Sequence, residues 1–398
     1  MEESGAAQPT AGVRMKRQLT LSNAVAVTVS VIIGSGIFLS PKGVLQATGS
    51  VGLSLIVWSL SGILATLGAL CYVELGTTIP KSGGTYTYLY EMFGPWVGFM
   101  KMWQTLIISG PAGTAVLAIT IANYALYPFF APCPAPYLAV RLIAAACLGL
   151  ISFLNCYSVR MAAQMNNVLT FLKVGALGII IIFGVIQLAR GHTENFELPK
   201  AFEGTTSSVG SAAVAFYASL WALDGWQAPN SLIEELINPN RNLVFTIVIS
   251  MPLVTIVYLL TNIAYFTAMT PAEMIASDAV AVLPSVLCAF ASDEGKQAFG
   301  GDVPITMSGS AGYQGELNLA VPVMFVCMCL FMMVLSFVSA PVECGIGAVV
   351  SATAVPVYAV FIHWENKPAW FLSSEGFVTS RLQLILNVVP QDPEIKLE

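Results

Sequence analysis

The feature that most constrains this chain is a series of long apolar segments separated by short polar ones. A helix needs about 20 mostly apolar residues to cross the hydrocarbon core of a bilayer, and several of these segments reach that length. Charged residues make up only 10% of the 398 residues, well below the roughly 25% of a soluble domain. The sequence therefore predicts an all-α, polytopic membrane protein that lies in a lipid bilayer. No basic patch suggests a nucleic-acid partner.

Nine membrane spans are expected, and basic residues just before the first span predict a cytoplasmic N-terminus. The expected spans are residues 21–40, 52–78, 96–127, 138–158, 167–189, 211–232, 245–269, 319–338 and 345–363. The regions we expect are an N-terminal tail (1–20), a transmembrane region (21–282), an atypical segment of low structure (283–318), two further spans (319–363) and a cytoplasmic C-terminal tail (364–398).

The first span is interrupted at its centre by Gly34 and Gly36. Glycine loosens a helix, and in hydrocarbon each freed backbone N–H or C=O needs another partner. One interpretation is a broken helix whose free amides face an anionic group and whose free carbonyls face a cationic one. The other interpretation is a pair of glycines that lets two helices pack closely. The glycines alone do not decide between these two.

The sixth apolar segment also predicts a break, because Asp224, Gly225 and Pro229 follow one another near its middle. A carboxylate at that depth costs about 2.5–3.5 kcal/mol on insertion scales and usually faces a cavity. The alternative role for Asp224 is structural, as the partner of a polar group on another helix. Trp221 precedes Asp224 by one turn and so shares its face. Interruptions in helices one and six predict an inverted repeat of five helices.

Three stretches carry a resemblance to the light chains of the heteromeric amino acid transporters, the L-type members of the APC superfamily. They are IIGSGIFLSPKGVL at 32–45, GALCYVELGTTIPKSGG at 68–84 and EELINP at 234–239. The resemblance implies a five-plus-five inverted-repeat fold. It also implies a sodium-independent exchanger that works by alternating access and does no chemistry on its substrate. The motif LWALDGW at 220–226 is most similar to the broad-specificity members that carry neutral and basic amino acids.

The resemblance also implies a set of substrate-binding residues. They are Ile32, Ile33, Gly34, Ser35, Gly36, Ile37, Trp221, Ala222, Asp224 and Gly225. The amides of Ser35 and Gly36 are expected to hold the substrate carboxylate. The carbonyls of Ile32, Trp221 and Asp224 are expected to hold the α-ammonium group. Trp221 is the expected gate, and Asp224 is expected to favour cationic side chains, because a poorly solvated carboxylate attracts them strongly.

Cys133 lies in the outer loop between the third and fourth spans, where the surroundings are oxidising. The resemblance implies a disulfide from Cys133 to a single-pass heavy-chain glycoprotein, in a plasma-membrane heterodimer; a free loop thiol is the alternative. Gly110 stands where members that carry anionic substrates have an arginine. His192 and His363 are isolated, so no metal, cofactor or enzyme site is expected.

The chain departs from the family between residues 283 and 318, where helices eight to ten of the family have no counterpart. We expect the substrate motifs to be intact and transport to be impaired in this shortened form. A non-transporting isoform that only binds the heavy chain is the alternative. A channel or membrane enzyme is disfavoured, because Asp224 stands almost alone among acid–base residues at the midplane.

Overall fold

The computed structural model describes residues 17–130, 135–276, 327, 334 and 341–363. The chain divides into two compact units, Met1–Gly347 and Ala348–Glu398. All regular structure in the described residues is helical. One isolated parallel bridge between Leu19 and Leu236 is the exception. The expectation of an all-α chain is confirmed for these residues.

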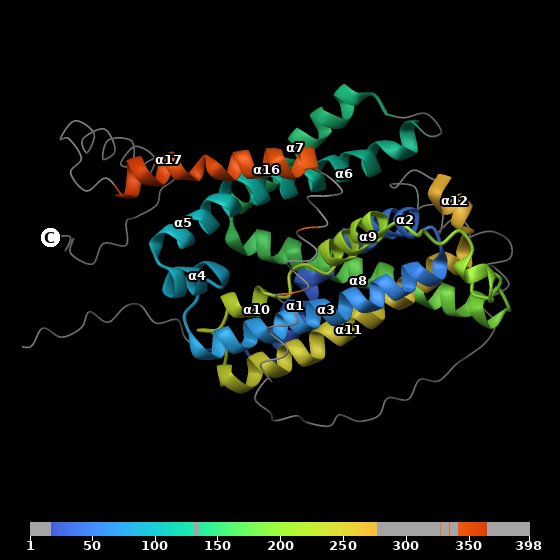
Figure 1. The fold of residues 1–398 in the computed structure, drawn as a ribbon, viewed down its shortest axis with the longest axis horizontal. Helices are drawn as coiled ribbons and strands as arrows, with labels where there is room; N and C mark the ends of the chain where they lie inside the picture. The colour runs from blue at the N-terminus through green and yellow to red at the C-terminus, as the bar shows by residue number, and fades with distance from the viewer. Residues whose placement is uncertain (1–16, 131–134, 277–326, 328–333, 335–340, 364–398) are drawn as a thin grey trace, which may run out of the picture. The chain divides into compact units, whose positions relative to one another are not determined.

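Figure 1 shows the helices in order along the chain. In the first unit they are α1 (Leu21–Ile32), α2 (Gly36–Thr48), α3 (Val51–Thr78), α4 (Thr85–Phe93), α5 (Pro95–Trp103), α6 (Gly110–Phe130), α7 (Tyr137–Tyr157), α8 (Val159–Ala189), α9 (Val209–Ala222), α10 (Ala228–Ser231), α11 (Pro239–Ala268) and α12 (Pro271–Ala276). A π-helical turn, Gln104–Ser109, joins α5 to α6. Helix α16 (Pro341–Ala352) crosses the boundary between the units, and the second unit contains α17 (Ala354–Tyr358) and the π-helical turn Ala359–His363.

Five helical stretches of the described residues are long and apolar enough to span a membrane: α3, α5 with α6, α7, α8 and α11. The pair α1 and α2 makes a sixth span if it is counted as one, with a bend of 49° at its break. The expected span at 211–232 is divided between α9 and α10, and that at 345–363 falls on α16, α17 and the turn after it. Apart from residues 327 and 334, the expected span at 319–338 lies outside the described residues, as does segment 283–318.

The core of the first unit lies where α3 packs against α11 and where α2 packs against α9. The Trp58 ring meets the Tyr258 ring edge-on, with ring centroids 5.8 Å apart. The Ser61 and Ser219 hydroxyls, 2.6 Å apart, link α3 to α9. Apolar side chains along α7 are instead exposed, as at Phe153. Exposed apolar side chains suit helices whose outer faces meet lipid tails.

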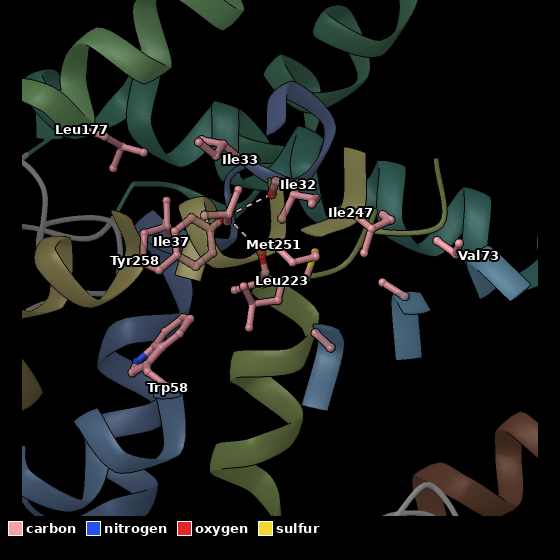
Figure 2. Close-up of a cluster of buried hydrophobic side chains, with 14 of the residues drawn as sticks. Ile32, Ile33, Ile37, Trp58, Val73, Leu177, Leu223, Ile247, Met251 and Tyr258 are labelled. Carbon is pink, nitrogen blue, oxygen red and sulfur yellow. Dashed lines mark hydrogen bonds between the residues drawn. The ribbon is translucent and has the colours of Figure 1, made fainter. Parts of the chain in front are cut away.

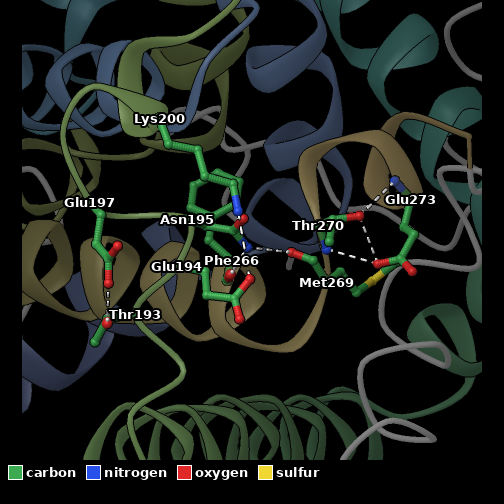
Figure 3. Close-up of polar contacts among 9 residues, drawn as sticks. All are labelled: Thr193, Glu194, Asn195, Glu197, Lys200, Phe266, Met269, Thr270 and Glu273. Carbon is green, nitrogen blue, oxygen red and sulfur yellow. Dashed lines mark hydrogen bonds and ion pairs between the residues drawn. The ribbon is translucent and has the colours of Figure 1, made fainter.

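The last turn of α11 is closed by polar contacts from two directions (Figure 3). Asn195 Nδ2 donates to the carbonyls of Phe266, at 2.8 Å, and Met269, at 3.4 Å. These carbonyls have no partner within the helix because they lie at its C-terminal end. Thr270 and Glu273 then form a capping box that starts α12: the Thr270 amide donates to Glu273 Oε2 at 2.8 Å, and the Glu273 amide donates to Thr270 Oγ1 at 3.3 Å.

Candidate functional site: two helix breaks that meet

The first break separates α1 from α2 at Ile33, Gly34 and Ser35, none of which is helical. The Gly34 amide turns back to the Ile32 carbonyl at 2.8 Å, which closes a tight turn in place of a helical hydrogen bond. Ser35 is the N-cap of α2, but its side chain makes no capping hydrogen bond. The interruption expected at these glycines is present in the structure.

The second break separates α9 from α10 at residues 223–227, which form turns. Gly225 has a φ of 108°, a backbone conformation that L residues rarely adopt. Pro229 follows near the start of α10, where a missing amide hydrogen costs nothing. Gly225 therefore ends one half-helix, and Pro229 begins the next.

The two breaks lie against each other in the core. A Cβ atom added to Gly36 would lie 2.6 Å from Ala222 Cα. A Cβ atom added to Gly225 would lie 2.9 Å from Val31 Cγ1 and 3.4 Å from the Ile32 amide nitrogen. Both approaches join the first break to the second, because each glycine contacts the residues that end the other helix.

The sequence left two interpretations of the first break, a broken helix or a close-packing pair of glycines, and each applies to one of the two glycines. Gly36 is a close-packing glycine, since the atom opposite it belongs to the α9 backbone. Gly34 has open space around it, and a Cβ there would meet only the Ile32 carbonyl, at 3.9 Å. Gly34 thus permits the break itself, and Gly36 permits the close approach of the other half-helix.

Tyr258 of α11 links the two breaks, and the sequence reading missed it. Its buried hydroxyl lies 2.9 Å from the Ile32 carbonyl and 3.1 Å from the Ala222 carbonyl (Figure 2). These carbonyls end α1 and α9, so each lacks a normal helical partner. One hydroxyl hydrogen is shared between two acceptors. A phenol in the middle of the apolar segment 239–268 was the only sequence signal.

Two backbone amides at the start of α2 lack a hydrogen-bond acceptor among the described residues. No described residue accepts a hydrogen bond from the amide of Ser35 or of Gly36. Both amides lie at the positive end of a helix, which attracts anions. The expected carbonyl ligands are more occupied. The Ile32 carbonyl already accepts from Gly34 and Tyr258, and the Trp221 carbonyl lies 3.3 Å from the Asp224 amide.

The expected side chains of the second break divide between core and surface. Ala222 is buried, whereas Trp221 is 46% exposed and Asp224 is exposed. Gln227 Nε2 donates to Asp224 Oδ1 at 3.2 Å. The sequence predicts a poorly solvated carboxylate at this position, whereas Asp224 is exposed in the structure. Trp221 and Asp224 do share the open face.

Ile33 and Ile37 are buried core side chains, with exposed fractions of 3% and 0%. Any contact that they make with a ligand would come from their backbone. A second residue that sequence reading missed is Lys173 of α8, whose Nζ donates to the Ser30 carbonyl of α1 at 2.6 Å. The Ser30 hydroxyl lies 2.9 Å from Thr170 Oγ1, so α8 holds the last turn of α1 at two points.

Two other expectations concern residues away from the breaks. Cys133 lies outside the described residues, so its disulfide stays a prediction. Within the described residues, no group of three or more His, Cys, Asp or Glu side chains is arranged to hold a metal ion.

Two interrupted helices that meet inside a bundle of apolar helices define the class as a polytopic membrane protein of transporter type. The chain belongs to the amino acid permease family, whose model matches residues 19–300. It is 38% identical to the human (Homo sapiens) cystine/glutamate transporter over 466 positions, covering 96% of this chain and 93% of that protein.

Two further relatives are transporters and not enzymes. The chain is 34% identical to large neutral amino acids transporter small subunit 2 of Rattus norvegicus, covering 98% of this chain and 89% of the relative. It is 48% identical over 268 residues to b(0,+)-type amino acid transporter 1 of Mus musculus, covering 67% of this chain and 55% of the relative. The 466-position alignment is longer than the 398-residue chain, so it includes residues of the relative that this chain lacks.

Proposed function

We propose that this chain is a light chain of a heteromeric amino acid exchanger and that it binds its substrate at the two breaks. One observation carries the proposal: the amides of Ser35 and Gly36, which donate to no acceptor in the described part of the chain, lie at the start of α2 beside the second break. A carboxylate that accepts from both amides would also face the positive end of the helix. Family membership supports amino acid transport in general.

The remaining candidates complete a site for a zwitterion. The α-ammonium group, a donor only, would approach the carbonyls of Trp221 and Asp224. To bind the Ile32 carbonyl as well, it would have to displace the hydrogen bond from Gly34 or the one from Tyr258. The backbone of Ile33, Gly34, Ile37, Ala222 and Gly225 would shape the site by its conformation. The exposed ring of Trp221 is the proposed gate, and the two half-helix pairs would open alternately to each side of the membrane. This exchange would be independent of sodium.

We propose neutral and basic amino acids as the substrates. Asp224 supplies a negative charge on the open face, and a lysine or arginine side chain would pair with it. The similarity to the b(0,+)-type relative is higher over its matched region than the similarity to the cystine/glutamate transporter. Gly110 in α6 adds no positive charge for an anionic side chain.

The partner and location follow from the same resemblance. We propose a disulfide from Cys133 to a heavy-chain glycoprotein and a multi-pass location in the plasma membrane, with no cofactor. One relative, from Rattus norvegicus, is called a transporter small subunit, which agrees with a light chain. Because the scaffold helices eight to ten have no counterpart, we propose that exchange is impaired while ligand binding is retained.

The test is equilibrium binding of radiolabelled arginine, leucine and glutamate to the full chain in nanodiscs, followed by exchange in proteoliposomes. Arginine and leucine should bind, and glutamate should not. Asp224→Asn should weaken arginine binding at least tenfold and leave leucine binding unchanged, whereas the control Glu203→Gln in the α8–α9 connection should change neither. Robust exchange would refute the impairment. Heavy-chain capture with no binding of any amino acid would select the non-transporting isoform.

A further inference from the structure

The interface between α3 and α11 holds three buried side chains with unused hydrogen-bonding capacity. Ser54, Trp58 and Asn262 are exposed by 0%, 1% and 0%. Ser54 Oγ, Trp58 Nε1 and Asn262 Oδ1 have no hydrogen-bond partner among the residues that the structure describes. A buried polar atom left unpaired costs about 1–3 kcal/mol, so three in one interface call for an explanation.

The helix register places Ser54 and Asn262 at one level, one turn from the pair Trp58 and Tyr258. Trp58 meets Tyr258, and a Cβ atom on Gly62 would lie 2.3 Å from Thr255 Cγ2. Residue numbers rise along α3 as they fall along α11, so the helices are antiparallel. Ser54 lies one turn from Trp58 on the same face, and Asn262 lies one turn from Tyr258 on the same face. Each step is about 6 Å in the same direction, so Ser54 and Asn262 share a level.

The hydrogen-bonding chemistry of the three groups is complementary. Trp58 Nε1 can only donate, Asn262 Oδ1 can only accept, and Ser54 Oγ can do either. Asn262 Nδ2 already donates to the Tyr258 carbonyl at 2.8 Å, which leaves Oδ1 as the free end of the amide. A cation does not suit the set, because the indole N–H presents a positive hydrogen. A group that both donates and accepts does suit it.

We propose that one water molecule binds between α3 and α11 at this level. It accepts from Trp58 Nε1, donates to Asn262 Oδ1 and shares a hydrogen bond with Ser54 Oγ, which gives it the usual three partners of a buried water. The site lies one turn from Tyr258, which bonds both breaks, and the Trp58 ring that would donate to the water meets the Tyr258 ring edge-on (Figure 2). The water thus fixes the side chain that supports Tyr258, apart from the proposed amino acid site.

The first test is radiolytic hydroxyl-radical labelling of the full chain in nanodiscs, read by mass spectrometry. Radicals formed from a bound water oxidise the side chains around it, even where bulk solvent cannot reach. Trp58 should be oxidised several-fold faster than Phe266, after each rate is divided by its rate in the unfolded chain. Phe266 is the matched control, since it is buried to a similar degree, at 0% exposure against 1% for Trp58, but lies in another hydrophobic cluster. Equal protection of both rings would overturn the proposal.

The second test is a double-mutant cycle on thermal stability. Ser54→Ala and Asn262→Leu should each lower the melting temperature, because each leaves the other groups poorly paired. The melting temperature of the double variant should fall by clearly less than the sum of the two single shifts. In the double variant neither position 54 nor position 262 has a polar side chain left unpaired when the water is gone. Ser54→Ala should also reduce the labelling of Trp58. Additive shifts with unchanged labelling of Trp58 would show that no shared ligand exists.

Discussion

At the scale of single residues, the centre of this protein depends on what is absent from three positions. Gly36 and Gly225 lack the Cβ atoms that would separate the two breaks, and Gly34 leaves room for the turn between the half-helices. The polar atoms that these breaks expose are then shared between Tyr258 and the proposed ligand. The glycines and the tyrosine therefore act on the same few backbone atoms.

Gly36→Ala should destabilise the protein by about 1–3 kcal/mol, because the added methyl group meets the α9 backbone, which cannot rotate away. Thermal melting followed by size-exclusion chromatography would measure the loss. Gly43→Ala is the control within α2, because no atom of the described residues lies within 4 Å of its Cβ position and alanine favours a helix by up to about 1 kcal/mol. Equal melting temperatures for the two variants would contradict the close approach of Gly36 to Ala222.

Tyr258→Phe should cost about 1–2 kcal/mol, since it removes one shared hydrogen bond and leaves the Ala222 carbonyl poorly paired in the core. The phenylalanine ring keeps the edge contact with Trp58, so the packing loss should be small. Tyr217→Phe is the control, because that ring is 59% exposed and lies on α9. If both variants melt at the wild-type temperature, the hydroxyl does not hold the two breaks together.

At the scale of helices, small residues decide which pairs come close. Gly184 of α8 faces Ala264 of α11, and an added Cβ would lie 2.3 Å from Ala264 Cβ and 2.5 Å from Ala264 Cα. Without a hydrophobic force between helices in lipid, close backbone approach is a main source of helix association. Helix α8 is otherwise held to α1 by the contacts of Lys173 and Thr170 near Ser30.

Gly184→Ala should destabilise the protein, whereas Gly178→Ala should not. Both residues lie in α8, and both substitutions raise helix propensity by up to about 1 kcal/mol. At Gly184 the methyl group would force α8 and α11 apart, so the melting temperature should fall. At Gly178 the added Cβ would meet none of the residues that the structure describes within 4 Å, so the melting temperature should stay or rise. A rise for both variants would show that α8 and α11 are not in close contact.

The capping box of α12 predicts a pH-dependent term. Hydrogen bonds from the Thr270 amide and hydroxyl lower the pKa of Glu273 below its ordinary value. A lowered folded-state pKa gives stability that is present above the unfolded pKa, about 4.3, and is lost as pH falls through the folded value. Glu273→Gln should therefore melt lower than wild type near neutral pH, and the difference should vanish in acid. Glu203→Gln should show no such change in difference with pH.

At the scale of the whole chain, the order of the helices predicts the side on which each loop lies. Between Leu19 and α12 the chain makes seven passes if α9 and α10 together cross the membrane: α1–α2, α3, α5–α6, α7, α8, α9–α10 and α11. An odd number of passes puts the two ends on opposite sides. The basic residues before the first span then place α12 outside.

A cysteine at Glu273 should react with a membrane-impermeant maleimide in intact cells. A cysteine at Gln18 should react only after the cells are permeabilised. The wild-type chain, which has eight cysteines of its own, is the background for both. Labelling of both positions from the same side would mean that α9 and α10 form a re-entrant pair that does not cross the membrane.

The sequence by itself determined the helical class, most spans and the positions of both breaks. Apolar length and glycine, proline and aspartate inside an apolar run are local signals that need no neighbour. The bounds of α3 and α7 fall within a residue of those expected. The family resemblance then supplied the roles proposed for Ser35, Gly36, Trp221 and Asp224.

The tertiary structure alone decided which glycine packs and which one bends, that Tyr258 bonds both breaks, and that Asp224 is exposed. The roles of the glycines and of Tyr258 depend on contacts between residues more than 30 positions apart in the chain. The exposure of Asp224 depends on which side of its segment the neighbouring helices leave uncovered. An isolated apolar pattern carries no such information, because in a membrane almost every face of a helix is apolar whether it meets protein or lipid.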